Sequence, residues 1–255
     1  MHKILKLSAI AVCVTGLVAC GGGGSSSTSA PLPAASAAQG VYQGTTSNSK
    51  TVDVLVLEDG AFWEIYGVPS GSALAVQGIV AGPSTASNGT FSASFNDFLS
   101  PGNSPISGQA SGTYLTGVSL NGTATENGLT TNFNLMAPVQ STYNYNTAAN
   151  LASIAGSWSG GLLNGETATI NIQSNGTFSG TSSLGCVFSG TATPRPSGKN
   201  VFNISLTFGA SPCVAANQTV SGIGLTYPLT NNTNQLIVGL VNPSQTLATA
   251  FFAQR

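Results

Sequence analysis

The segment Gly40-Val41-Tyr42-Gln43-Gly44 recurs 116 positions later in the chain as Gly156-Ser157-Trp158-Ser159-Gly160. The hairpin sequence Asp59-Gly60-Ala61-Phe62 recurs at the same offset as Asn175-Gly176-Thr177-Phe178. Two separate matches at one offset indicate an internal duplication, because unrelated segments rarely share both a motif and a spacing. We therefore expect the chain to contain two lobes of similar design.

The lobes are predicted to span residues 40–146 and 154–255, with a linker at residues 147–153. Each lobe contains short β-rich runs, and several of these runs alternate between apolar and polar residues. Thr147–Ile154 is the one candidate for a helix, and it is short. The predicted fold class is therefore all-β, with two antiparallel meanders of about eight strands each.

Turn residues separate the β-rich runs. The expected strands are Thr51–Leu57, Ala73–Val80, Gly89–Phe98, Val118–Thr125, Thr131–Met136, Thr167–Ile172, Val201–Phe208 and Gln235–Val241. Asn-Gly and Asp-Gly pairs between the runs supply the positive φ that tight hairpin turns require. These pairs are Asp59-Gly60, Asn121-Gly122, Asn127-Gly128, Asn164-Gly165 and Asn175-Gly176.

Each meander could close into a small barrel or fold into a sandwich. Closure is the better expectation, because it removes exposed strand edges that this chain has few charges to protect. The whole sequence of 255 residues carries 6 Lys and Arg and 7 Asp and Glu. A barrel that spans a membrane is a competing interpretation, but the aromatic girdles of such barrels are not evident in the sequence.

The first hairpin allows two registers, which differ in where its carboxylates point. A two-residue turn at Asp59-Gly60 would place Asp53 and Glu64 on one face, about 7 to 8 Å apart at the backbone. That spacing could in principle serve glycoside hydrolysis or bind a cation. A three-residue turn with a bulge at Gly60 would put Asp53 on the opposite face from Glu64.

The second lobe favours the bulged register. That register brings Ile170, Ile172 and Phe178 onto one side of the equivalent hairpin, as a buried face requires. We therefore do not expect Asp53 and Glu64 to form a catalytic pair, and solvated or rim carboxylates are the simpler interpretation.

The residue types present exclude several classes of function. His2 is the only histidine, so Ser-His-Asp and Cys-His nucleophiles and histidine metal sites are not expected after the leader is removed. The bases of the mature chain are Lys50, Arg195, Lys199 and Arg255. They form no basic patch, so nucleic acid is not an expected partner. We expect no catalytic residues, no metal site and no cofactor.

Apolar side chains occupy both faces of the first hairpin. Leu55 and Leu57 cannot share a face with Val54 and Val56, because side chains alternate along a strand. The outer face is therefore expected to be covered, either by the other lobe or by a partner protein. The possible interaction surface consists of Leu55, Leu57, Tyr66, Tyr143 and Tyr145. The last two tyrosines could stack on a sugar or belong to a closing strand at the lobe junction.

Cys186 and Cys213 are the cysteines that remain outside the first 20 residues. In an oxidising compartment the expected state of such a pair is a disulfide. Closing a loop of this size is expected to stabilise the fold by roughly 3 to 4 kcal/mol. A metal or redox pair would need CxxC spacing or histidine partners, which the sequence lacks.

The N-terminal residues carry a localisation signal. A basic start precedes an apolar run, Leu7–Val18, which closes on Leu17-Val18-Ala19-Cys20. The run is well short of the about 20 residues that a spanning helix needs. This arrangement resembles the signal peptide and lipobox of bacterial lipoproteins. The resemblance implies that residues 1–19 are removed and that Cys20 receives a lipid, which makes the membrane a partner.

Residues 20–39 are rich in Gly, Ser, Ala and Pro. Such a segment is expected to be a disordered tether with a root-mean-square span of about 25 Å. Gly21 stands where lipoproteins of Gram-negative bacteria commonly carry an aspartate that retains them at the inner membrane. We therefore expect a lipid anchor in the outer membrane of the cell envelope, on its periplasmic or its surface side.

The tethered, two-lobed plan resembles surface lipoproteins with paired small barrels, such as the transferrin-binding lipoproteins. The resemblance is one of architecture and includes no binding motif. It implies a non-enzymatic lipoprotein that presents a duplicated barrel to a protein or a glycan. The alternatives are an envelope structural or assembly factor and a carrier of a small apolar ligand. A ligand-sized cavity in one barrel would favour the carrier, whereas filled cores in both barrels would count against it.

Overall fold

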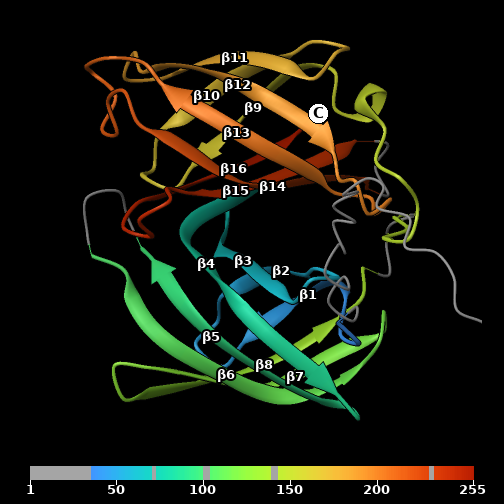
Figure 1. Ribbon diagram of the computed structural model, residues 1–255. Helices are drawn as coiled ribbons and strands as arrows, with labels where there is room; N and C mark the ends of the chain where they lie inside the picture. Colours follow the sequence, from blue (N-terminus) through green and yellow to red (C-terminus); the bar gives the residue numbers. More distant parts are fainter. Residues whose placement is uncertain (1–35, 71–72, 100–103, 139–142, 230–232) are drawn as a thin grey trace, which may run out of the picture. The chain divides into compact units, whose positions relative to one another are not determined.

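The computed structural model describes residues 36–70, 73–99, 104–138, 143–229 and 233–255 (Figure 1). The predicted signal peptide, the lipobox with Cys20 and the tether up to residue 35 lie outside these residues. The described chain forms two closed antiparallel barrels of eight strands each. The arrangement confirms the predicted all-β fold class and decides between barrel and sandwich in favour of the barrel.

Each barrel is a meander in which every strand pairs with the next. In barrel 1, β1 pairs with β8 to close the circle, and in barrel 2, β9 pairs with β16. The strands of barrel 1 are β1 (Gly40–Thr46), β2 (Thr51–Val56), β3 (Ala61–Ser70), β4 (Ala73–Ser87), β5 (Thr90–Phe98), β6 (Ile106–Leu115), β7 (Ser119–Glu126) and β8 (Leu129–Met136). The strands of barrel 2 are β9 (Gly156–Leu162), β10 (Thr167–Ile172), β11 (Thr177–Ser182), β12 (Val187–Pro194), β13 (Phe202–Phe208), β14 (Thr219–Pro228), β15 (Asn234–Val241) and β16 (Ala248–Gln254).

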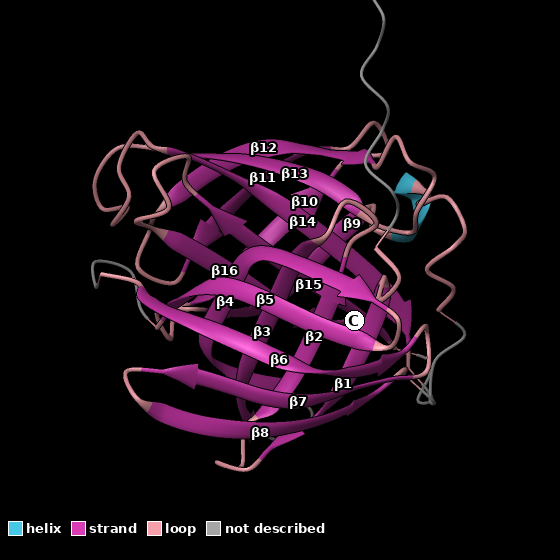
Figure 2. Ribbon diagram, turned by 60° about the horizontal axis from the view of Figure 1, so that its bottom comes forward, coloured by secondary structure: helices cyan, strands magenta, loops and turns pink. Residues whose placement is uncertain are grey.

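A short 3₁₀ helix, η1 (Leu151–Ser153), lies within the predicted helix candidate and is drawn in cyan in Figure 2. Asn150 caps it, because its side-chain oxygen accepts a hydrogen bond of 3.0 Å from the backbone amide of Ala152. In the part of the chain that the structure describes, no helix is long and apolar enough to cross a membrane.

The duplicated hairpin has the same structure in both barrels. Gly60 and Gly176 follow β2 and β10 and adopt φ of +83° and +86°. Their carbonyl oxygens accept hydrogen bonds from the backbone amides of Ser84 and Ala192, at 2.7 and 2.8 Å. A Cβ at either glycine would lie 2.7 or 2.1 Å from a carbonyl oxygen of the neighbouring strand. Glycine is therefore required at both turns for its conformation and for space.

The first hairpin adopts the bulged register. Val54 pairs with Glu64, and Asp53 pairs with Ile65. Because side chains alternate, Asp53 and Glu64 point to opposite faces of the sheet. The carboxylate pair considered for glycoside chemistry therefore does not form.

One predicted turn is wrong. Asn121-Gly122 lies inside β7, where it pairs with β6 and β8. The turn before β7 uses Gly117 instead, with φ of +64°. Gly122 has a packing role, because an added Cβ would lie 2.1 Å from the carbonyl oxygen of Ser111. An Asn-Gly pair can therefore mark a close approach of strands as well as a turn.

Buried apolar side chains form three clusters. One lies inside barrel 2, one lies inside barrel 1, and the third lies between the barrels. Strand β2 shows how alternation divides them, because Val54 and Val56 face the interior of barrel 1 whereas Leu55 faces barrel 2. The third cluster includes Leu55, Ile65 and Ile79 from barrel 1 and Ile223, Ile237 and Phe252 from barrel 2.

The two ends of barrel 1 are named here by the chain direction. The near end is where β1 begins and where the turn Asp59-Gly60 lies. The far end holds the loop at residues 47–50 and the turn Asn127-Gly128. Because neighbouring strands are antiparallel, the odd-numbered strands run from the near end to the far end.

Residues 36–39, which the sequence predicts as tether, pack against the near end. The backbone amide of Ser36 donates a hydrogen bond of 2.8 Å to the carbonyl oxygen of Glu58. The Tyr42 hydroxyl donates one of 2.9 Å to the carbonyl oxygen of Ala38, which is fully buried. The described chain therefore enters barrel 1 at its near end.

Candidate functional site

The two barrel interiors differ in how completely side chains fill them. Barrel 1 contains a cavity of about 490 Å³, whereas the void in barrel 2 is about 80 Å³. Inward positions of β6 and β7 carry the small residues Gly108, Ala110, Gly112, Gly122 and Ala124. The interior of barrel 2 carries Phe178, Phe188, Phe202, Ile204 and Leu206. Of the two barrel interiors, as far as the described residues define them, that of barrel 1 reaches the size of ligand pockets, roughly 300 to 1,000 Å³.

Large side chains close the near end of barrel 1. Tyr42 and Phe91 are fully buried there, and Leu120 is 1% exposed. The hydroxyl of Tyr42 is fixed by its bond to Ala38 and by a hydrogen bond of 3.3 Å from the amide of Gly117. The cavity therefore ends on a packed, apolar floor.

Among the described residues, the lining of the cavity at the far end comes from loops and strand ends. Its lining includes Asn48 and Lys50 from the loop at residues 47–50 and Leu99 after β5, and Leu99 is 42% exposed. Leu163, from the turn between β9 and β10 of barrel 2, also lines the cavity. The far end is therefore the end at which the described strands do not close the cavity.

Three carboxylate side chains line the cavity: Glu64 of β3, Asp97 of β5 and Glu126 of β7. Glu64 and Asp97 lie in one row, because each pairs with Val80 of the intervening strand β4. The Tyr66 hydroxyl lies 2.8 and 3.0 Å from the two carboxylate oxygens of Asp97. The negative charge of Glu126 also acts on Asp97. Among the described residues, no group of three or more His, Cys, Asp or Glu is placed to hold a metal ion.

Enclosure changes the acidity of these groups. Burial, helped by the negative charges of Asp97 and Glu126, raises the pKa of Glu64 to about 8. Burial and the neighbouring Glu126 also raise the pKa of Asp97, although the hydrogen bond from Tyr66 opposes the change. Glu64 is therefore mainly protonated at neutral pH. Lys50, the only base among the described lining residues, donates a hydrogen bond to a side-chain oxygen of Gln77.

Asp97 and Glu126 are cavity residues that the sequence interpretation did not identify. A signal for Asp97 was present, because it stands an even number of residues after Phe91 and Phe95 and therefore shares the inward face of β5. The cavity itself had no such signal, since it depends on small residues summed over several strands.

Tyr66, one of the predicted interaction residues, faces the cavity, where it bonds to Asp97. Leu55 and Leu57 are 2% and 1% exposed and belong to the cluster between the barrels. The outer face of the first hairpin is thus covered by the second lobe, which is one of the two alternatives that the sequence allowed.

Tyr143 and Tyr145 also lie where the barrels meet. The Tyr143 hydroxyl donates a hydrogen bond of 2.6 Å to the carbonyl oxygen of Asn200, and its ring meets that of Tyr227 edge-on. The Tyr145 hydroxyl donates one of 2.8 Å to the carboxylate of Glu58. These tyrosines join the barrels and do not form an exposed stacking platform.

Asp53 is enclosed between the barrels. It accepts hydrogen bonds from the side-chain amide of Gln43 and from the Tyr227 hydroxyl of barrel 2. Burial nevertheless raises the pKa of Asp53 to about 6. This carboxyl group therefore joins the two barrels and does not face the cavity.

A second polar contact joins the barrels at the near end. Arg195 of barrel 2 forms ion pairs with Glu58 at 2.5 Å and with Asp59 at 2.6 Å. Burial alone would raise the pKa of Glu58, but hydrogen bonds from Ser197, Arg195 and Tyr145 lower it to about 2. Glu58 is therefore charged in its folded environment at any pH near neutrality.

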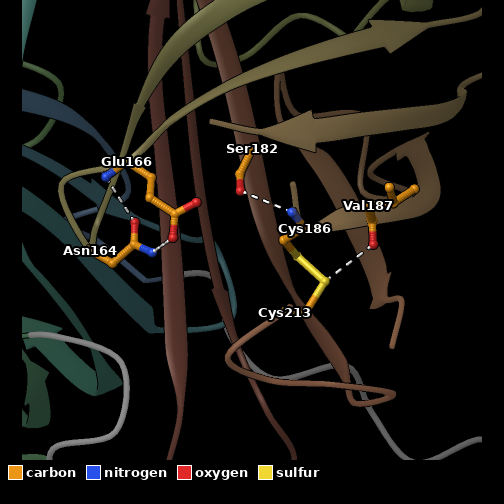
Figure 3. Close-up of a disulfide and its surroundings, with 6 residues drawn as sticks. All are labelled: Asn164, Glu166, Ser182, Cys186, Val187 and Cys213. Atoms are coloured by element: carbon orange, nitrogen blue, oxygen red, sulfur yellow. Dashed lines mark hydrogen bonds between the residues drawn. A yellow bond between two sulfur atoms is a disulfide. The ribbon is translucent and has the colours of Figure 1, made fainter. Parts of the chain in front are cut away.

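The structure contains the predicted disulfide between Cys186 and Cys213, with a Cα–Cα distance of 4.5 Å (Figure 3). It ties the turn between β11 and β12 to the loop between β13 and β14. Ser182 accepts a hydrogen bond of 3.3 Å from the amide of Cys186. Glu166, also drawn in Figure 3, contacts Asn164 through one carboxylate oxygen and has its other oxygen buried without a partner.

Comparison with protein-family models finds no match, and comparison with curated proteins finds none either. Two solved structures are similar. One is the isotype 1 transferrin binding protein B from serogroup B Neisseria meningitidis, with 11% identity, a TM-score of 0.28, and coverage of 81% of this chain and 65% of that one. The other is a DUF3598-family protein of unknown function from Nostoc punctiforme, with 14% identity, a TM-score of 0.26, and coverage of 85% and 96%. TM-scores this low do not establish a shared function.

Proposed function

We propose that this protein is a non-enzymatic binding protein of the cell envelope that holds a small, partly apolar molecule inside barrel 1. The observation that carries the proposal is the cavity of about 490 Å³, which has a packed apolar floor at the near end and is lined by loop residues at the far end. Barrel 2 has the same strand plan and a void of about 80 Å³. The fold therefore does not require a cavity, and the small inward residues of barrel 1 create one.

Binding of a protein or a glycan takes second place. The residues that favoured it in the sequence were Leu55, Leu57, Tyr143 and Tyr145, and the contact between the barrels occupies all four. A cavity in one barrel beside a filled barrel is the outcome that favours a small-ligand carrier. We therefore place the carrier first among the functions that the sequence allowed.

We further propose that a lipid on Cys20 anchors the protein to the outer membrane. The support is the lipobox motif, the Gly- and Ser-rich residues that follow it and a disulfide of the kind found outside the cytoplasm. In cell fractionation, wild-type protein is expected in the outer-membrane fraction, whereas the Cys20→Ala variant is not. Equal distribution of both proteins between fractions would contradict lipid anchoring, and protease treatment of intact cells would tell which side the barrels occupy.

The cavity proposal predicts that filling the cavity weakens binding. Ala124 lines the cavity, whereas the next residue of β7, Thr125, is exposed on the outer face. We expect Ala124→Phe to weaken binding of the neutral fluorescent dye prodan by at least about tenfold, equivalent to about 1.4 kcal/mol. Fluorescence titration of the full chain with Cys20→Ala as the common background would measure the change.

Thr125→Phe is the matched control, because it adds the same side chain one position away on the opposite face. Its dye affinity should equal that of the parent protein. Thermal unfolding of both variants would establish that they fold. Equal loss of binding in the two variants, or no loss in Ala124→Phe, would overturn a binding site inside barrel 1.

A further inference from the structure

We infer that the molecule held in barrel 1 carries a protonated amine next to its apolar part, and that the carboxyl groups of Glu64, Asp97 and Glu126 bind this amine. The inference rests on the proposed ligand-binding function and names the chemical class of the ligand. The observation that carries it is a cavity with an apolar floor at the near end and three acids farther toward the far end.

The same order of residues appears on three strands that run from the near end to the far end. On β3 the inward residues are Phe62 and then Glu64, on β5 they are Phe91, Phe95 and then Asp97, and on β7 they are Leu120, Ala124 and then Glu126. The floor of the cavity is therefore apolar, and the three acids lie between that floor and the far end, where Val52, Leu99 and Leu163 add apolar lining. A ligand that matches both parts would insert its apolar part first.

Glu64 differs from Asp97 in its contacts with the residues that the structure describes. No described residue donates a hydrogen bond to its carboxyl group, although the side chain lines the cavity. Asp97, by contrast, bonds to Tyr66. Because the side chain of Glu64 lines the cavity, it is the acid whose partner we expect the ligand to supply.

The charge of the lining selects the ligand class. Lys50 is the only described base that lines the cavity, and it contacts Gln77. An anionic ligand such as a carboxylate would face three carboxyl groups, and each one that is ionised would repel it. A neutral ligand gains no charge interaction with these acids, whereas a protonated amine supplies a positive charge and up to three hydrogen-bond donors.

Such binding is coupled to protons. Burial raises the pKa of Glu64 to about 8, so the empty site holds its proton at neutral pH. A bound cation favours the ionised carboxylate, and the proton then leaves to the solvent. Affinity for the amine should therefore rise between pH 6 and pH 8, by up to about tenfold per pH unit for each proton released.

The test compares three water-soluble ligands that share one apolar group: 4-phenylbutylamine, 4-phenylbutanol and 4-phenylbutanoate. Titration calorimetry on the full chain with Cys20→Ala, in phosphate and in Tris buffer, gives affinity and proton release together. At pH 7.5 we expect the amine to bind at least about tenfold more tightly than the alcohol. The carboxylate should bind most weakly, and only the amine should release protons.

Glu64→Gln keeps the shape of the side chain and removes its charge. We expect it to reduce the advantage of the amine over the alcohol to less than about threefold and to reduce proton release. Asp97→Asn should act in the same direction. Glu166→Gln, a carboxyl group outside the cavity lining of barrel 1, is the matched control and should change neither quantity.

The possible outcomes separate the two proposals. If the alcohol or prodan binds in the cavity and the amine binds no more tightly than the alcohol, the inference that the ligand carries an amine is overturned. The proposed binding function would still stand. If a divalent metal ion alone releases the same protons, the acids bind a metal ion, and the inference that the ligand carries an amine is again overturned. If neither prodan nor any of the three ligands binds, the binding function itself fails.

Discussion

Asp53 and Glu64 show how one register decides the chemistry of a residue. They stand on adjacent strands, and a two-residue turn would have placed them together on one face. The bulge at Gly60 sends Glu64 into the cavity and Asp53 into the contact with barrel 2. Burial raises the pKa of both acids, but only Glu64 can reach a solute.

Asp53 gives a pH-dependent prediction. Its folded pKa of about 6 lies above the ordinary value of 3.8, so the folded chain binds the proton more tightly than the unfolded chain. The stability contributed by protonated Asp53 is fully present below about pH 4 and is lost as the pH rises through 6. This loss amounts to about 3 kcal/mol at about 1.4 kcal/mol per pKa unit.

The Asp53→Asn variant cannot lose this proton and keeps an oxygen that accepts hydrogen bonds. The difference between its free energy of unfolding and that of the wild type should therefore rise, in favour of the variant, by about 3 kcal/mol between pH 4 and pH 7. Urea denaturation at several pH values would measure the difference. Glu64→Gln is the comparison, because its difference from wild type should continue to grow up to about pH 8. A constant difference for Asp53→Asn across the range would contradict the prediction.

At the scale of strands and turns, local patterns predicted much of the fold. The run Thr51–Leu57 and the pair Asp59-Gly60 became β2 and its turn, because alternation and positive φ are properties of neighbouring residues. Strand β4 was predicted to end at Val80 but continues to Ser87. Its last residues are small and polar, so they lack a β-rich pattern and gain their structure from pairing with β3 and β5.

The candidate site was less predictable than the strands around it. The lipobox and the disulfide are local or composition signals, whereas the cavity arises from missing volume at positions such as Gly108 and Ala110 on one strand and Ala124 on another. No single strand reveals that volume. Asp97 and Glu126 come together only when the barrel closes, so their joint role depends on tertiary structure.

At the scale of the whole molecule, the cluster between the barrels couples them. It buries residues from both barrels as completely as the interiors do, and Arg195 and Asp53 add polar contacts across it. A shared core of this kind makes separate unfolding unfavourable, because either barrel would expose the apolar wall of the other.

We therefore expect both barrels to unfold in one transition. The chain has two tryptophans, Trp63 in barrel 1 and Trp158 in barrel 2. The variants Trp63→Phe and Trp158→Phe each keep one tryptophan, so the fluorescence of each reports on one barrel. After correction for the stability of each variant, the two unfolding curves in urea should have the same shape. Two separate transitions in the wild-type protein would contradict the expectation.

Leu55→Asp tests the cause of this cooperativity, because it places a charge in the contact between the barrels. The variant should lose stability and show transitions that no longer coincide. The equivalent change at an exposed position of barrel 1, Ser92→Asp, is the control and should leave a single transition.

The filled interior of barrel 2 has a consequence for how the duplicated halves share their tasks. A barrel that contains a cavity lacks some of the dispersion contacts that a packed core supplies. The interior of barrel 1 therefore contributes less stability than the interior of barrel 2. Barrel 2 has a packed interior and supports barrel 1 through the apolar cluster between them. After the duplication the two copies therefore differ in role: barrel 1 contains the cavity, and the packed barrel 2 stabilises it.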